Sequence, residues 1–138
     1  MKNIIVSHGN CPDGAGSAVV AKLIAPSIQF IRGYHDKIDE QVLNAAKSLK
    51  EKGRLWIVDI SCSEKTLKET CAIIKEKNAV LGVYEHHVSQ EYLASFDLPE
   101  GLKGEIIFDN DRCGSKIFFD RMLEDYPSEL NDLKDFIR

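Results

Sequence analysis

The sequence predicts an α/β fold of three layers, with a mostly parallel sheet of about five strands and helices on both of its faces. Short continuous apolar runs alternate with longer amphipathic stretches, which is typical of repeated strand–helix units around a sheet buried on both faces. The length of 138 residues and the 43% hydrophobic content fit one domain with its own core. We therefore expect a single domain over residues 1–138.

The strands are placed by the apolar runs, and the helices by the amphipathic stretches between them. The predicted strands span residues 3–8, 28–32, 54–59, 79–84 and 105–108. The predicted helices span residues 14–25, 39–51, 63–77 and 114–125, with a last one from 127 to the chain end. Gly53 is expected to close the second helix, and Ser63 to cap the third.

The last helical pattern contains no Gly or Pro that would end it before Arg138. The chain is therefore expected to be a fragment of a longer protein. A natural C-terminus that packs onto the domain is the alternative.

Charge and hydropathy exclude several classes of protein. The net charge of −4 gives no long-range attraction for polyanions, so any contact with nucleic acid must be local. The apolar runs are far shorter than the roughly 20 residues that span a bilayer. The N-terminal apolar run is also shorter than the about 7–15 residues of a signal peptide, so a cytoplasmic location without membrane partners is expected. The four cysteines form no Cys-x-x-Cys pair, and reduced thiols are expected.

Ligand-type side chains follow three of the predicted strands. In an open parallel sheet, the carboxyl ends of the strands border one ligand crevice. His8, Asp13, Asp59 and His86 would meet there as a set of imidazoles and carboxylates that suits Mn²⁺, Fe²⁺ or Zn²⁺. Such a set can hold two ions about 3.5–4 Å apart for attack on a phosphoryl group, with Asp59 bridging them. Taken alone, Asp59 also fits a helix cap or a turn.

The Glu85–His87 segment is the strongest single indication of a functional site. Two adjacent imidazoles after a carboxylate are energetically costly to place unless they bind a polar or charged partner. One imidazole can bind a metal while the other meets the substrate. A partly exposed turn is the alternative. His35 follows the second strand without such companions and is not expected to take part.

Two strand–helix junctions suit an anion. Residues 8–17 contain small residues at a helix start, although they match neither the Walker A motif nor a full dinucleotide fingerprint. In the second junction, Arg112 can hold a phosphate by forked contacts, and Gly114 lets a backbone N–H approach it. The alternatives are that Asp109 or Asp111 caps the helix and that Arg112 pairs with these aspartates.

These residues together resemble the DHH phosphoesterase family, which includes RecJ-like exonucleases and oligoribonucleases. His8 through Ala18 is similar to the family's first motif, Asp59 within 57–61 looks like the second, and Glu85–His87 the third. Residues 112–115 resemble the fourth motif less specifically. The resemblance implies an N-terminal α/β lobe with two Mn²⁺ ions, ligated by His8, Asp13, Asp59 and His86. It also implies that His87 contacts the scissile phosphate.

The chain departs from the family pattern at two positions and in length. Cys11 stands where many members have a metal-binding Asp, although the Cys-Pro-Asp-Gly string also looks like that of an oligoribonuclease-like subgroup. Glu85 stands where the family name has Asp. The chain also has neither the length nor the Gly-rich motif of the family's C-terminal, substrate-holding lobe.

The resulting hypothesis is a metal-dependent phosphoesterase that cuts a phosphodiester or phosphoanhydride in a nucleotide or short oligonucleotide by two-metal activation of water. Asp59 would bridge the ions, and His87 with Arg112 would stabilise the charge that develops on the phosphoryl oxygens. Arg112, Gly114 and His87 would contact the substrate. The alternative is a non-catalytic nucleotide-binding or regulatory domain with a degraded metal site. A homodimer is left open.

Overall fold

The computed structural model describes residues 2–8 and 12–131, with side chains at 2–8 and 16–131. The strands are β1 (Asn3–His8), β2 (Gln29–Gly33), β3 (Arg54–Val58), β4 (Val80–Glu85) and β5 (Lys103–Phe108). The helices are α1 (Pro12–Ile24), α2 (Ile38–Ser48), α3 (Glu64–Glu76), the 3₁₀ helix η1 (Val88–Ser95), α4 (Gly114–Asp125) and α5 (Pro127–Leu130). Each of the five predicted strands is confirmed within two residues.

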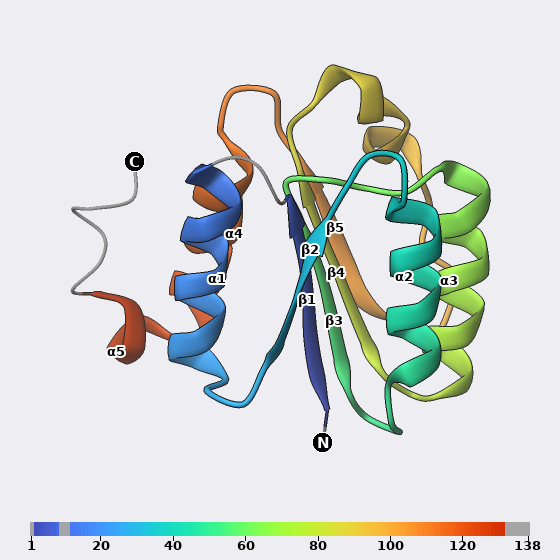
Figure 1. Ribbon diagram of the computed structural model, residues 1–138, viewed down its shortest axis with the longest axis horizontal. Helices are drawn as coiled ribbons and strands as arrows, with labels where there is room; N and C mark the ends of the chain where they lie inside the picture. The colour runs from blue at the N-terminus through green and yellow to red at the C-terminus, as the bar shows by residue number, and fades with distance from the viewer. Residues whose placement is uncertain (1, 9–11, 132–138) are drawn as a thin grey trace.

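The five strands form one all-parallel sheet in the order β2-β1-β3-β4-β5. Helices α1, α4 and α5 cover one face, and α2 and α3 cover the other (Figure 1). The predicted three-layer α/β fold is therefore confirmed. Because every strand is parallel, all the strand ends that carry ligand-type residues lie at the same edge of the sheet, at the top of Figure 1.

The core consists of two apolar layers that the sheet separates. Successive residues of a strand point to opposite faces, so Ile4 and Val6 of β1 pack towards α2 and α3 while Ile5 packs towards α1 and α4. In the second layer the Phe118 ring lies edge-on to Trp56 at 5.1 Å between ring centroids. The central strands β1, β3 and β4 are buried on both faces and read as continuous apolar runs, and this is why the sequence identifies them.

The ends of the helices are less well predicted. Ser63 caps α3 as expected, since its Oγ accepts a hydrogen bond from the backbone N–H of Thr66. The prediction for Gly53 is wrong, because α2 ends at Ser48, and Gly53 lies just before β3. A Cβ at Gly53 would lie 2.5 Å from the carbonyl oxygen of Lys2. Glycine is needed there for the close approach of two chain segments.

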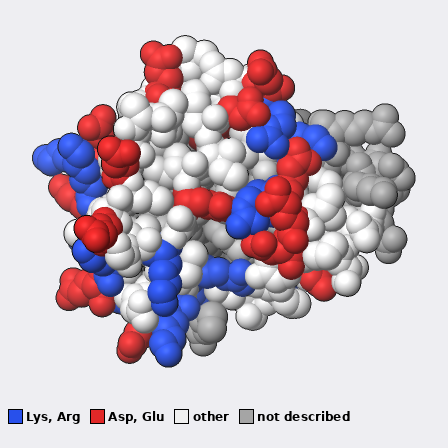
Figure 2. Space-filling view, turned by 180° about the vertical axis from the view of Figure 1, so that it is seen from behind, with Lys and Arg blue, Asp and Glu red and all other residues white. Residues whose placement is uncertain are grey.

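The surface carries charges of both signs, and two of the cysteines are buried. On the face seen in Figure 2, both acidic and basic side chains lie at the surface. Among the described residues, no helix has the length and hydropathy of a membrane span. Cys62 and Cys71 are buried free thiols, and burial raises their pKa values to about 12 and about 11. Cys11 lies outside the described residues.

Candidate metal centre

Asp59 occupies a special backbone position directly after the central strand β3. Its φ of 63° is left-handed, which is uncommon for a residue other than glycine but easier for Asp and Asn than for most. The backbone N–H of Asp59 donates to the carbonyl of Tyr84 at the end of β4. The side chain is only 1% exposed. A carboxylate in a strained, buried position is typical of a functional site.

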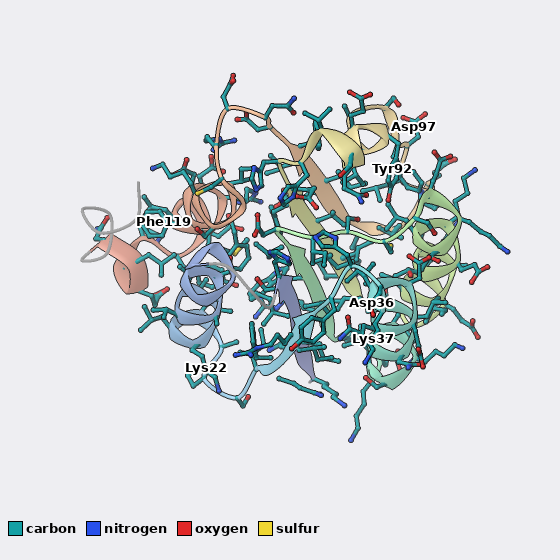
Figure 3. The ribbon with its side chains drawn as sticks, turned by 45° about the horizontal axis from the view of Figure 1, so that its top comes forward. Lys22, Asp36, Lys37, Tyr92, Asp97 and Phe119 are labelled. Atoms are coloured by element: carbon teal, nitrogen blue, oxygen red, sulfur yellow. The ribbon has the colours of Figure 1, made fainter. Side chains whose placement is uncertain are left out.

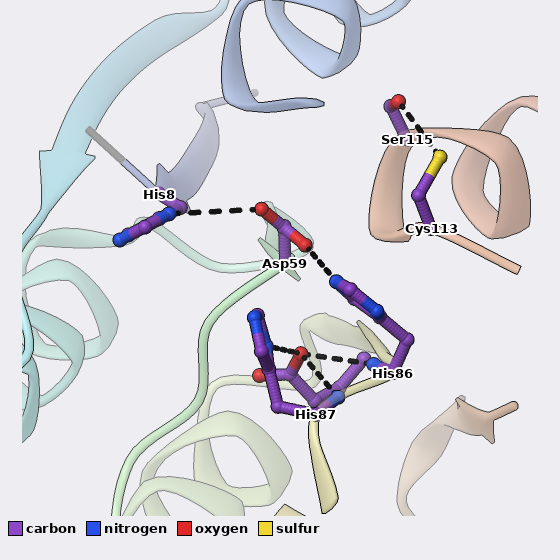
Figure 4. Close-up of polar contacts among 7 residues, drawn as sticks. His8, Asp59, His86, His87, Cys113 and Ser115 are labelled. Atoms are coloured by element: carbon purple, nitrogen blue, oxygen red, sulfur yellow. Dashed lines mark hydrogen bonds and ion pairs between the residues drawn. The ribbon is translucent and has the colours of Figure 1, made fainter. Parts of the chain in front are cut away.

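The two carboxylate oxygens of Asp59 face histidines from the strands on either side (Figure 4). Oδ1 lies 2.7 Å from His86 Nε2, which follows β4, and Oδ2 lies 3.8 Å from His8 Nδ1, which ends β1. Ser63, not Asp59, caps α3, so a capping role does not explain this carboxylate. The strand order β1-β3-β4 places Asp59 between its two partners.

Glu85 uses only one of its two carboxylate oxygens within the described residues. Oε1 accepts from His87 Nδ1 at 2.6 Å and from the backbone N–H groups of His86 and His87 at 2.9 and 3.3 Å. Oε2 is buried and has no hydrogen-bond partner among these residues. An unpartnered oxygen of a fully buried carboxylate is costly, and a cation would remove that cost.

Four residues therefore form a candidate metal-binding group. Asp59, Glu85, His86 and His87 can each offer one ligand atom, and these atoms lie within 4.8 Å of one another. The sequence hypothesis named Asp59 and His86 as ligands, and the structure brings both together with His8. The hypothesis did not name Glu85 as a metal ligand, and it assigned His87 to a contact with the substrate. Asp13 falls in the first turn of α1, and its side chain lies outside the described part.

His35, which the sequence analysis set aside, lies next to the histidines of the candidate site. Its ring centroid lies 5.0 Å from that of His8 and 6.4 Å from that of His87. That His35 takes no part in the chemistry stays a prediction. The missing information was strand order, since β2 lies next to β1 and delivers its following loop to the same edge. The strand-end rule that selected His8 would also have selected His35.

The start of α4 packs directly on Asp59. A Cβ added to Gly114 would lie 2.5 Å from Asp59 Cβ and 2.6 Å from its Oδ1, so only glycine allows this approach. The start of α1 lies beside it, because a Cβ at Gly16 would be 3.4 Å from Ser115 Cβ. The N-terminus of α4, which carries partial positive charge, therefore lies near the carboxylate. The role of Gly114 in substrate binding stays a prediction.

Arg112 is engaged in ion pairs. Its Nε lies 2.7 Å from Asp109, and one terminal nitrogen lies 2.8 Å from Asp120. Asp109 also accepts from the backbone N–H of Asp111, and this hydrogen bond together with that of Arg112 lowers the pKa of the Asp109 carboxyl. The N-cap residue of α4 is Cys113, so the capping role considered for Asp109 and Asp111 is not observed. The ion-pair alternative describes the contacts of Arg112.

Comparison with known proteins gives a fold but no family. No protein-family model matches the chain, and no curated protein matches it. The structure is similar to the crystal structure of an uncharacterized protein from Helicobacter pylori G27, with a TM-score of 0.70, 20% sequence identity and 91% of this chain covered. The chain spans 37% of the length of that protein. At this identity the likeness shows the shared α/β fold alone.

Proposed function

We propose that this chain is the metal-binding lobe of a phosphoesterase of the DHH type, which hydrolyses a phosphodiester or phosphoanhydride in a nucleotide or short oligonucleotide. The observation that carries the proposal concerns Glu85, whose buried Oε2 has no partner among the described residues. The same side chain offers a carboxylate oxygen within 4.8 Å of ligand atoms of Asp59, His86 and His87. Buried polar atoms without a hydrogen-bond partner are uncommon in folded proteins, which favours a ligand-binding role for Glu85 over a purely structural turn.

The donor set fits a divalent transition metal. Carboxylate oxygens and imidazole nitrogens suit Mn²⁺, Fe²⁺ or Zn²⁺, and we propose Mn²⁺ from the family resemblance. Asp59, Glu85 and His86 would hold one ion. The second carboxylate oxygen of Asp59 faces His8, which supports a bridging role towards a second ion on the β1 side, with Asp13 as a further ligand. A divalent ion supplies positive charge for phosphoryl oxygens and makes water a better nucleophile near neutral pH.

His87 is the residue that we assign to the scissile phosphate. The 2.6 Å contact between its Nδ1 and Glu85 Oε1 fixes the ring and leaves Nε2 for the substrate. With Nδ1 donating to Glu85, Nε2 donates a hydrogen bond to a phosphoryl oxygen in the doubly protonated ring and accepts one in the neutral ring. His87 is also the more exposed of the two adjacent histidines, at 36% against 24% for His86.

Turnover and its dependence on His87 test this function. With Mn²⁺, the full-length protein is expected to hydrolyse short RNA, a cyclic dinucleotide or pyrophosphate, and to lose activity with a chelator. His87→Gln is expected to lower kcat by about 10²- to 10⁴-fold, as for the loss of an acid–base group, while Mn²⁺ affinity measured by calorimetry changes far less. If His87→Gln abolishes Mn²⁺ binding instead, His87 is a ligand. Nucleotide binding without any turnover in saturating Mn²⁺ would favour the regulatory-domain alternative.

Arg112 can reach a substrate only by leaving its aspartate partners. Asp120→Asn removes one of them, so this variant is expected to bind inorganic phosphate up to about fivefold more tightly in the presence of Mn²⁺, in line with the small energy of partly exposed ion pairs. Glu124→Gln is the matched control, because Glu124 pairs with Arg121 on the same helix. Equal phosphate affinity in Asp120→Asn, Glu124→Gln and the parent protein would show that Arg112 does not contact the substrate.

A further inference from the structure

A groove of about 250 Å³ lies at the opposite end of the sheet from the metal centre, where the strands begin. Its walls come mainly from the amino-terminal halves of β3, β4 and β5 and from the end of α4. This end of the sheet is at the bottom of Figure 1. Helix α4, which carries the Phe119 labelled in Figure 3, starts on Asp59 and ends at the groove. The groove is therefore separate from the candidate metal centre.

One wall of the groove holds charges that largely compensate one another. Arg121 lies 2.8 Å from Glu105 and 3.0 Å from Asp125. The second oxygen of Glu105 accepts from the Tyr84 hydroxyl at 2.8 Å. The Tyr84 ring folds back over Gly82, since a Cβ there would lie 2.6 Å from the hydroxyl oxygen. Both oxygens of Glu105 are therefore used, and water screens the half-exposed Asp125.

Arg54, on the other wall, is held in place by neutral partners. Its Nε donates to the Asn3 side-chain oxygen at 3.3 Å, and one terminal nitrogen donates to the Tyr126 hydroxyl at 2.8 Å. Its guanidinium carbon lies 4.6 Å from the centre of the Trp56 ring, which is a cation–π contact. Among residues 2–8 and 16–131, Arg54 makes no ion pair with a carboxylate, in contrast to Arg121, and its other terminal nitrogen makes no hydrogen bond.

A half-buried guanidinium of fixed orientation without a carboxylate partner suits an oxyanion. Arginine binds carboxylate and phosphate groups in the plane of its fork, and such charge-assisted hydrogen bonds are about twice as strong as neutral ones. Because Asn3, Tyr126 and Trp56 already hold the side chain, binding costs it little further conformational entropy. The geometry therefore favours a negatively charged ligand group at Arg54.

We propose that this groove is a ligand site for a small molecule that carries a carboxylate or phosphate group. The oxyanion binds Arg54, and the apolar part of the ligand packs against Val80 and Met122, which also line the groove. The site does not depend on the metal centre or on the proposed phosphoesterase activity.

Fluorescence of Trp56 tests the proposal, because Trp56 is the only tryptophan of the sequence and lies in contact with Arg54. The probes are benzoate, phenyl phosphate and the neutral benzamide, added to protein that dialysis has freed of metal, so that no phosphate is held by a metal ion. At least one of the two oxyanions is expected to bind saturably, with a Kd on the order of 1 mM. Benzamide has the shape of benzoate without its charge and is expected to bind at least about tenfold more weakly. The tighter of the two oxyanions identifies the ligand group as carboxylate or phosphate.

Substitutions at Arg54 and its anchor locate the bound oxyanion. Arg54→Gln is expected to lower the affinity for the tighter oxyanion by roughly 10- to 100-fold, the effect of a charged hydrogen bond. Arg54→Lys keeps the charge but not the fork, so an intermediate loss is expected. Tyr126→Phe removes one neutral hydrogen bond to Arg54 and is expected to cost roughly three- to tenfold. Arg32→Gln is the matched control, because it removes the same charge from an exposed position on β2 and should leave the affinity unchanged.

Three results would overturn the site. They are no saturable fluorescence change with either oxyanion, equal affinity for benzamide and the tighter oxyanion, and an equal loss of affinity in Arg54→Gln and Arg32→Gln. Urea unfolding checks that each variant is folded. If Arg54→Gln shows no cooperative transition, Arg54→Lys and Tyr126→Phe decide, and unchanged oxyanion affinity in both would reject Arg54 as the binding residue.

Discussion

Asp59→Asn is expected to abolish Mn²⁺ binding, with a loss on the order of 100-fold or more, since even the outer partners of a metal site are worth about 10–100-fold. The carboxylate is buried, and its two oxygens face His86 and His8. Its single negative charge would therefore attract metal ions on both sides of Asp59. An amide has a similar shape but no charge, and it offers one oxygen instead of two. The measurement is titration calorimetry with Mn²⁺.

The backbone makes asparagine the right substitution at this position. The φ of 63° is left-handed, and Asn tolerates that region almost as well as Asp, whereas alanine would add backbone strain. Asp97→Asn is the matched control, because Asp97 is an exposed aspartate on a different part of the surface. Mn²⁺ affinity that is the same in Asp59→Asn as in Asp97→Asn would rule out the proposed metal centre.

Gly114→Ala is expected to lower both stability and metal affinity. The new methyl group would overlap Asp59 at 2.5 Å from Cβ and 2.8 Å from Cα, so either α4 or the segment after β3 must move. Overpacking of this kind costs about 1–3 kcal/mol, which outweighs the about 1 kcal/mol that alanine gains over glycine in a helix. Urea unfolding should show the loss, and Mn²⁺ affinity should fall on the order of tenfold because Asp59 is displaced.

Gly16→Ala provides the comparison within the same pair of helices. Its Cβ would lie 3.4 Å from Ser115 Cβ, an ordinary van der Waals contact, so alanine is expected to leave stability equal or slightly higher. Should Gly114→Ala unfold at the same urea concentration as Gly16→Ala, the tight contact between α4 and Asp59 would not constrain the site.

Much of the fold can be predicted from the sequence, because the burial of a strand is reflected in the residue types along it. A parallel strand covered on both faces must be apolar along its length, and β1, β3 and β4 show this as unbroken runs. The same reasoning finds part of the site, because every parallel strand ends at one edge. His8, Asp59 and His86 were found in this way, and the structure places all three together.

The sequence fails where a property depends on partners distant along the chain. Strand order is such a property, and the position of β2 beside β1 decides that His35 joins the histidines. The end of α2 is another such property. The backbone is already extended at Leu49, and Gly53 allows a close approach to the Lys2 carbonyl instead of capping the helix.

From its residues alone, the chain is predicted to be an α/β protein with ligand-type side chains at one edge of a parallel sheet. Which of these side chains contact one another becomes known from the packing of the elements. In the described part of the chain, one Glu85 oxygen is hydrogen-bonded and the other has no partner, Arg112 pairs with Asp109 and Asp120, and Gly114 packs against Asp59. The physical reason is that apolar periodicity records whether a residue is buried, whereas the choice of a hydrogen-bond or ionic partner depends on how separate elements pack.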